Sequence, residues 1–449
     1  MAHMKNIVAV SVVVGALAAG CNKENKSTVG GSGSSQPASP TAPSPGSGAS
    51  PGSATVATPP APAAPLDPAA ASKIATASNE FGFDLWAKLG TGSNQTVSPA
   101  SISLALTMTW GGAKAATAAQ LAKALHLTEA TEPTLAAWGG LARSLLSSDA
   151  KMKLTIANRL FGDKSYTFEK PFLDATAKHF DAALEPVDFR SNAEPARAHI
   201  NSWIESKTNQ LIKELLPPGA VMPDTRLVLV NAIYFLAKWQ QEFEGDNTRD
   251  AEFNTSKKTK VKVPTMNQTA YHRSAKIDGG RVLELPYQGG NTAMWIVLPD
   301  AVDGLAAVEQ KLSAAALASW GSKLEAKNTA VALPRFELKP AESLNLGKLL
   351  QELGVVDAFN GSLADFTGIA NPASPADRLY ISGVFHKAYV KVNEQGTEAA
   401  AATAVSMARA GGVPEQPMAF TVDRPFAFFI VDKTSGLVLF MGRVVDPTK

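Results

Sequence analysis

Cysteine is almost absent from this sequence, because Cys21 is the only one among 449 residues. An internal disulfide and a cysteine metal cluster are therefore excluded. Basic runs with interleaved aromatics are also missing, and the formal net charge is only +2, which argues against an obligate nucleic-acid binder. What is present is a globular composition, 45% hydrophobic and 18% charged. The length fits one large domain or two to three smaller ones.

Signatures of catalysis and of metal binding are missing as well. The sequence has no His-Glu-x-x-His, and no glycine-rich phosphate loop opens an expected helix. A GASPG stretch at 48–52 matches the nucleophile-elbow pattern of hydrolases. That motif needs a strand before it and a helix after it, and neither is expected there, so we interpret the match as chance. The sequence therefore predicts no catalytic residue, no metal ligand and no enzyme activity.

The six histidines do not alter this interpretation. His386 differs from the others because it lies in a mainly apolar stretch, ISGVFHK at 381–387. A buried neutral imidazole must find hydrogen-bond partners, so we interpret His386 as a core histidine. The alternative is a catalytic base, which would need a serine or threonine nucleophile beside it. Surface or capping roles are expected for His126, His179, His199 and His272.

The first residues are typical of an export signal. Lys5 precedes an apolar run at 7–19, which is shorter than the ~20 residues that span a bilayer. Small residues before Cys21 resemble a bacterial lipobox, although Leu17 lies one place from the usual position. We expect residues 1–21 to be a signal peptide, with Cys21 lipidated and the protein anchored in the bacterial cell envelope. The alternative is an ordinary secretory signal and a secreted protein.

Residues 22–68 consist of Ser, Pro, Gly, Ala and Thr with almost no large apolar side chain. Such a segment cannot bury enough surface to offset its ordering entropy, so we expect a disordered tether. From about residue 69 the composition changes. Helical spacing predicts helices near 74–89, 99–110, 116–125, 133–148, 168–179 and 343–354. Strands are expected at 154–156, 227–235, 261–263, 281–285, 293–298 and 330–338, which together indicate an α+β domain with antiparallel sheets.

Several stretches resemble the serpin family, and together they cover nearly all of residues 70–449. In chain order they are NQTVSPASI at 94–102, LVNAIYF at 229–235 with KW at 238–239, VNEQGTEAA at 392–400, DRPF at 423–426 and FMGRV at 440–444. The resemblance implies a serpin domain over 69–449 with a large, mostly antiparallel central sheet, two further sheets and about nine helices. It also implies an exposed reactive-centre loop over about 396–417 and a monomer without cofactors.

The stretch GTEAAAATAVSMARAGG at 396–412 has the pattern of a strand that is not yet in a sheet. Side chains alternate between faces with period two. The face that begins with Thr397 is small and mostly apolar, whereas the other carries one charge, at Glu398. Proline is absent until Pro414, so each N–H before Gly412 is free to join a ladder.

The resemblance supplies a mechanism for this stretch. In inhibitory serpins a serine protease cleaves the loop, the hinge enters the main sheet as a new strand, and the acyl-enzyme is trapped. By family position the hinge comprises Glu394, Gly396, Thr397, Glu398, Ala399, Ala400, Ala401 and Ala402. The residues expected to hold the sheet shut are Ser98, Ser101, Asn231 and His386. Trp239 is expected at the upper end of the sheet, and Arg335 as the ion-pair partner of Glu394.

Family spacing from Glu394 places the cleaved bond at Ala410-Gly411, which suits elastase-like or subtilisin-like proteases. A second candidate one residue earlier, Arg409-Ala410, suits trypsin-like proteases. Alanine also favours helices, so the alternative function is a non-inhibitory serpin that acts as a binding or carrier protein. Gly396, Thr397 and the four alanines of the hinge include no bulky or charged side chain, which favours inhibition.

Overall fold

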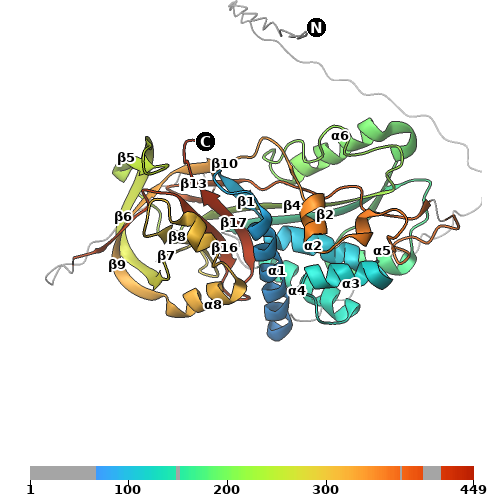
Figure 1. The fold of residues 1–449 in the computed structure, drawn as a ribbon, viewed down its shortest axis with the longest axis horizontal. Coiled ribbons are helices and arrows are strands. Elements are labelled where there is room, and N and C mark those ends of the chain that lie inside the picture. The colour runs from blue at the N-terminus through green and yellow to red at the C-terminus, as the bar shows by residue number, and fades with distance from the viewer. Residues whose placement is uncertain (1–66, 148–151, 375–376, 398–415) are drawn as a thin grey trace, which may run out of the picture. The chain divides into compact units, whose positions relative to one another are not determined.

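The computed structural model describes residues 67–147, 152–374, 377–397 and 416–449 (Figure 1). Nine α-helices lie within these ranges, and none of them is long and apolar enough to cross a lipid bilayer. They are α1 (Pro68–Lys88), α2 (Pro99–Trp110), α3 (Ala115–Ala124), α4 (Thr131–Ser147), α5 (Lys170–Phe180), α6 (Phe189–Lys207), α7 (Leu305–Glu309), α8 (Ala314–Lys323) and α9 (Gly347–Glu352). The helices expected near 74–89, 99–110, 116–125, 133–148 and 168–179 correspond to α1–α5.

The larger of the sheets has nine strands, and only the β9–β15 pair within it is parallel. Its order is β1 (Gln95–Val97), β17 (Val438–Val444), β16 (Phe426–Asp432), β8 (Thr292–Pro299), β7 (Gly280–Pro286), β6 (Lys260–Ile277), β9 (Glu325–Pro334) and β15 (Met418–Thr421), with β5 (Arg249–Asn254) also on β6. The long strand β6 pairs with β5 over one part and with β7 over another. Through β6, one continuous sheet therefore joins β5 to β7 and to the strands beyond β7.

The second sheet has six strands and is antiparallel except for the β2–β3 pair. Its order is β10 (Phe336–Leu338), β13 (Val390–Asn393), β14 (Gly396–Thr397), β4 (Leu227–Lys238), β2 (Met152–Asp163) and β3 (Leu184–Val187). A two-stranded sheet joins β11 (Leu344–Asn345) to β12 (Phe385–His386). The α+β fold class with three mostly antiparallel sheets is confirmed.

Strand β4 lies inside the six-stranded sheet, as its continuous apolar sequence predicts, because both of its faces are covered. On one face Val230 packs in a cluster with Ile200 and Ile204 of α6. On the other face Leu229 packs against a cluster that contains Ile102 and Leu106 of α2. Helix α2 begins where expected, since the Ser98 side chain accepts the Ser101 N–H at 3.2 Å and Pro99 occupies the first helical turn.

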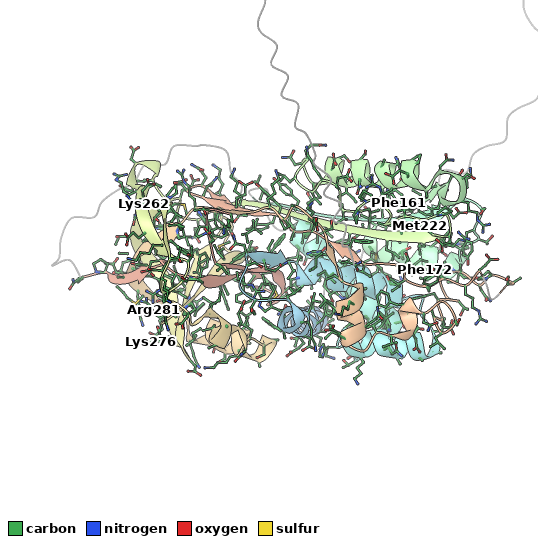
Figure 2. All side chains as sticks on the ribbon, turned by 45° about the horizontal axis from the view of Figure 1, so that its top comes forward. Phe161, Phe172, Met222, Lys262, Lys276 and Arg281 are labelled. Atoms are coloured by element: carbon green, nitrogen blue, oxygen red, sulfur yellow. The ribbon has the colours of Figure 1, made fainter. Side chains whose placement is uncertain are left out.

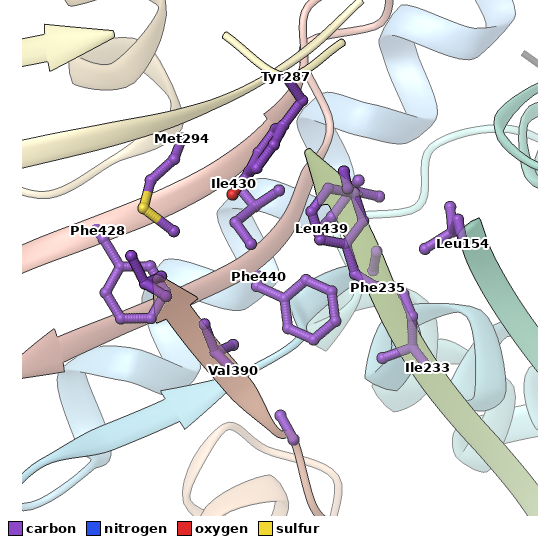
Figure 3. Close-up of a cluster of buried hydrophobic side chains, with 14 of the residues drawn as sticks. Leu154, Ile233, Phe235, Tyr287, Met294, Val390, Phe428, Ile430, Leu439 and Phe440 are labelled. Carbon is purple, nitrogen blue, oxygen red and sulfur yellow. The ribbon is translucent and has the colours of Figure 1, made fainter. Parts of the chain in front are cut away.

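The main core fills the space between the two larger sheets. Figure 3 shows Phe235 of β4 beside Phe440 of β17 and Tyr287. The ring of Phe235 lies 6.2 Å from that of Phe440 and 5.0 Å from that of Tyr287, both measured between centroids and both in tilted or edge-on arrangements. The last strands of the chain are thus part of the same core as the middle of β4.

Candidate functional site

The hinge forms a short hairpin at one end of β4. Residues 394–395 make the turn between β13 and β14, and β14 lies between β13 and β4. Thr397 pairs with Val392 on one side and with Ala237 on the other. The sequence predicts a strand that is outside the sheet. The structure differs at Gly396 and Thr397, which are already inside it because a gap between β13 and β4 accepts them.

Gly396 is required at this position for steric reasons. A Cβ added to Gly396 would lie 2.1 Å from the backbone oxygen of Ala237. Its φ of 152° is also one that residues with a Cβ rarely adopt. The Asn393 side chain stabilises the turn before it, accepting the N–H groups of Gln395 and Gly396 at 3.1 and 3.2 Å. Any larger residue at 396 would push the hinge off β4.

Thr397 is the first hinge side chain that points into the core, and it is 2% exposed. Its Oγ1 shares a 2.6 Å hydrogen bond with the hydroxyl of Tyr287, which is itself fully buried. Burial raises the pKa of Tyr287, so the hydroxyl stays neutral. The Tyr287 ring stacks on Trp239 with 4.6 Å between centroids and 11° between planes. The Trp239 indole N–H donates to the Asn393 carbonyl at 2.9 Å.

Glu394, at the turn, is held by an ion pair with Arg335, the partner expected from the sequence. Arg335 Nε donates to Glu394 Oε1 at 2.6 Å, and the Thr248 hydroxyl donates to the same oxygen at 2.5 Å. Burial alone would raise the pKa of Glu394, but these hydrogen bonds outweigh it and hold the pKa below its usual value. A charged carboxylate therefore pins the start of the hinge to β9–β10.

The four residues expected to hold the sheet shut lie together near the middle of β4. The Ser98 N–H donates to His386 Nε2 at 3.1 Å, and the Ser98 hydroxyl donates to the Leu439 carbonyl at 2.5 Å. The Ser101 hydroxyl donates to Asn231 Oδ1. Asn231 in turn donates to Asn158 Oδ1 of β2 at 2.6 Å.

His386 is a core histidine in the structure, 6% exposed, and burial lowers its pKa to about 4. Its Nε2 accepts a backbone N–H, while the nearby Ser98 hydroxyl is directed to a carbonyl. The pair therefore lacks the serine-to-histidine hydrogen bond that activates a nucleophile.

Below the hairpin the six-stranded sheet is divided. Within the described ranges, β4 pairs with β14 only at Lys238 and Ala237, and no ladder joins β4 directly to β13. A cavity of about 440 Å³ occupies this place. It is lined by 227–231 of β4, by 378–386 on the opposite side, by α2 below, and by Leu215, Leu216 and Ala220 after α6. The cavity thus lies beside 227–231 of β4, whereas β14 pairs with β4 at Ala237 and Lys238.

Several predicted residues lie outside the described ranges: Cys21, Glu398, Ala399, Ala400, Ala401, Ala402, Arg409, Ala410 and Gly411. Two histidine predictions need correction, because His179 is 4% and His272 is 3% exposed and neither is on the surface. His179 is buried at the end of α5, where its ring bonds to Glu132 at 3.0 Å. No group of His, Cys, Asp and Glu in the described part of the chain is arranged to hold a metal ion.

Two site residues were not predicted from the sequence, Tyr287 and Asn158. Tyr287 lies two residues after the expected strand 281–285, so an aromatic residue close to a strand end is the available signal. Asn158 lies opposite Asn231 in the β2–β4 ladder. Because its partner comes from a distant strand, no local pattern indicates it.

Comparisons with known proteins identify the family. The serpin (serine protease inhibitor) family model matches residues 76–447. The leukocyte elastase inhibitor of Sus scrofa is 42% identical over 389 residues, and Serpin B3 of Homo sapiens is 39% identical over 402; each alignment covers 84% of this chain and 100% of the relative. The solved structure of cleaved Serpin 42Da matches with a TM-score of 0.75 and 30% identity over 84% of this chain and 99% of that one. The chain therefore belongs to the serpin family.

Proposed function

We propose that this serpin inhibits serine proteases by cleavage and insertion of the segment after Thr397. The observation that carries the proposal is the divided sheet, in which β14 has started a strand at Ala237 and Lys238 of β4 and a cavity lies farther along the same strand, beside 227–231. Relatives that are named as elastase inhibitors, at about 40% identity, support an inhibitory function.

The driving force is the unfilled edge of β4. Residues 227–236 of β4 have no ladder on the β13 side within the described chain. A strand inserted there gains backbone hydrogen bonds, each contributing on the order of 1 kcal/mol, and buries one face of small side chains. The uncleaved molecule is then kinetically trapped rather than at its lowest free energy. Small residues after Thr397 favour insertion because bulk or charge would have to be forced between strands.

The proposed bait bond is Ala410-Gly411, with Arg409-Ala410 as the second candidate. Both rest on family spacing from Glu394. A small residue before the cleaved bond agrees with the elastase-inhibitor relatives, whereas an arginine would direct trypsin-like proteases to this loop.

The test is incubation with elastase, subtilisin and trypsin, followed by denaturing electrophoresis and sequencing of the released C-terminal peptide. We expect a covalent complex that survives denaturation and a peptide that begins at Gly411. A peptide that begins at Ala410 would assign the bond to Arg409. Clean cleavage without complex would instead identify a non-inhibitory binding or carrier protein, and hydrolysis of an added ester would identify an enzyme.

We also propose that Cys21 is lipidated and anchors a monomeric inhibitor in the bacterial cell envelope through the 22–68 segment. The support is the short apolar run followed by small residues and the single cysteine. Metabolic labelling with a fatty acid should mark the wild type and not Cys21→Ala. Labelling of both proteins alike, or of neither, would favour the secreted form. Sedimentation of residues 69–449 in the absence of detergent tests whether the domain is a monomer.

A further inference from the structure

Lysine is concentrated in one short hairpin of the chain, at the turn between β5 and β6. Four lysines lie within six positions there, whereas no other six-residue stretch of the sequence contains more than two basic residues. No acidic residue occurs between 255 and 263. We call residues 255–262 the lysine hairpin, and its lysines are Lys257, Lys258, Lys260 and Lys262.

The turn of the lysine hairpin is closed by its own hydrogen bonds. Ser256 Oγ accepts the N–H groups of Lys258 and Thr259, each at 3.1 Å. The Thr255 hydroxyl donates to the Thr259 carbonyl at 3.2 Å. The lysines are therefore presented from a defined backbone.

Two of the four lysines are neutralised by nearby carboxylates. Lys257 Nζ lies 2.7 Å from Asp303, and Lys260 Nζ lies 2.7 Å from Glu252. The other two have no carboxylate of the described residues within ion-pair distance. Because all four side chains are exposed, the hairpin presents a net positive charge to solvent.

The lysine hairpin projects from the domain. A cavity of about 860 Å³ lies against it, lined by the two threonines of the turn and Val261 on one side and by 338–344 and 445–449 on the other. Side chains alternate along a strand, so Lys260 and Lys262 point away from this cavity. Figure 1 shows β5 at a corner of the domain, and Figure 2 shows Lys262 at the outer edge of the same part. A flat surface can therefore contact the lysines before it meets the rest of the domain.

We propose that the lysine hairpin binds the anionic surface of a lipid bilayer. Lysines close to anionic headgroups gain favourable electrostatic energy, which falls off within a Debye length of about 8 Å at physiological salt. The proposal rests on the proposed lipid anchor at Cys21, which supplies the bilayer. The contact gives the anchored domain a preferred orientation on the membrane.

The length of the chain before α1 allows this contact. Cys21 and Asp67 are 46 positions apart, and a chain of that length spans at most about 160 Å. A domain of the size of residues 67–449 is roughly 55 Å across. Any face of the domain can therefore reach the membrane that holds Cys21.

The anchor also explains why a bilayer is favoured over a soluble sulfated polysaccharide. A few lysines bind an anionic surface only weakly. In a molecule that is already tethered, a second contact forms at a high effective concentration, and one lipid anchor together with a basic patch gives stable attachment where either alone is marginal. A soluble polysaccharide receives no such help from the tether.

The test uses Cys21 as the single cysteine of the chain. Full-length protein is coupled through Cys21 to maleimide lipid in phosphatidylcholine vesicles with or without phosphatidylglycerol. Amines are then acetylated with a water-soluble reagent, and each lysine is quantified by mass spectrometry. With phosphatidylglycerol, Lys258 and Lys262 should react about threefold more slowly than without it, and high salt should remove the difference. Lys123 of α3 and Lys348 of α9, both exposed, are the controls in the same molecule and should react equally on the two vesicles.

Equal reaction of Lys258 and Lys262 on both vesicles would overturn the proposal. Equal slowing of the two control lysines would also overturn it, because it would show adsorption without a preferred face. Protection by soluble dextran sulfate, with none by the vesicles, would identify a polysaccharide as the partner instead. Since the coupling supplies the anchor, protection of the hairpin in a protein that receives no fatty acid in cells would reject the anchor and leave the affinity of the hairpin for bilayers established.

Discussion

The two sides of β4 differ sharply in their pairing. On the β2 side the ladder is continuous, from Met152 opposite Ala237 to Gly162 opposite Leu227. On the β13 side, among the residues that the structure describes, only Gly396 and Thr397 pair with β4, and a cavity lies beside 227–231. Within the described ranges, the same strand is therefore paired along the whole of one edge and along only two residues of the other. On the proposed mechanism, the paired edge stabilises the fold and the unpaired edge is the one that gains free energy when a strand is inserted.

The largest expected effect comes from cleavage of the loop, which should remove the difference between the two edges of β4. Cleavage of the loop should let residues after Thr397 fill the second edge of β4, a gain on the order of 10 kcal/mol from about ten ladder bonds. For a domain of this size the melting temperature should rise by roughly 10 °C or more. Calorimetry of intact and cleaved protein measures the change. An unchanged melting curve after complete cleavage would show that the second edge remains empty.

Thr397→Arg should block insertion of the hinge as a strand beside β4, because it changes the first hinge side chain that is buried. The Thr397 side chain is buried against Tyr287, and an unpaired guanidinium there costs several kcal/mol. We expect a substrate that is cleaved without forming a covalent complex, as seen by denaturing electrophoresis. Thr397→Ser is the control, because it retains the hydroxyl and should still trap protease. Trapping by Thr397→Arg at the wild-type stoichiometry would contradict the hinge assignment.

Acid should weaken the contacts that hold the middle of β4. The folded pKa of His386 is lowered to about 4, below its usual value of ~6.5. Its contribution to stability is therefore complete above pH 6.5 and is lost as the pH falls toward 4, because the unfolded chain gains a proton first. The loss should reach about 3 kcal/mol at pH 4.

Urea unfolding between pH 7 and pH 4 measures this loss, with His386→Gln as the comparison. The variant should lose less stability than the wild type over that range by about the same amount. Parallel pH profiles for the two proteins would show that His386 does not titrate in this way. His272, whose pKa burial also lowers, is present in both proteins and cancels in the difference.

The smallest expected effect concerns the hydrogen bond between Tyr287 and Thr397. Tyr287→Phe keeps the stack on Trp239 and removes only the hydroxyl. Losing one buried hydrogen bond should cost about 1–2 kcal/mol, with faster amide exchange at Thr397 than in the wild type. Tyr234→Phe, at another buried tyrosine, which lies in β4, serves as the control. Unchanged exchange at Thr397 would indicate that the backbone ladder alone holds the hinge.

Much of the fold could be predicted from local patterns. The start of α2 follows from Ser98 and Pro99, and the central position of β4 follows from its unbroken apolar run. Helix α6 was not predicted because Pro195 lies inside it and Asn192 breaks its dihedral angles. Its buried residues, such as Ile200, are few, and they become recognisable only when the sheet beneath them is known.

The site was predictable only where family position indicated it. The Glu394–Arg335 pair and the cluster of Ser98 and His386 lie where expected. Alternation indicates which face of the hinge is apolar, but it does not indicate whether a neighbouring strand is available. The early pairing of Gly396 and Thr397 depends on the distance between β13 and β4, which is a tertiary property that local periodicity does not contain.

The order of strands in the nine-stranded sheet has a consequence for biosynthesis. Strands β16 and β17 follow all the other described strands in the sequence, yet they lie between β1 and β8 in the sheet interior. Thr96 bonds to the Met441 carbonyl across 345 positions of sequence. The nascent chain therefore contains all the described helices and the proposed bait segment before β16 and β17 are synthesised. On the proposed mechanism, the molecule therefore reaches its metastable state only after β16 and β17 have joined the sheet.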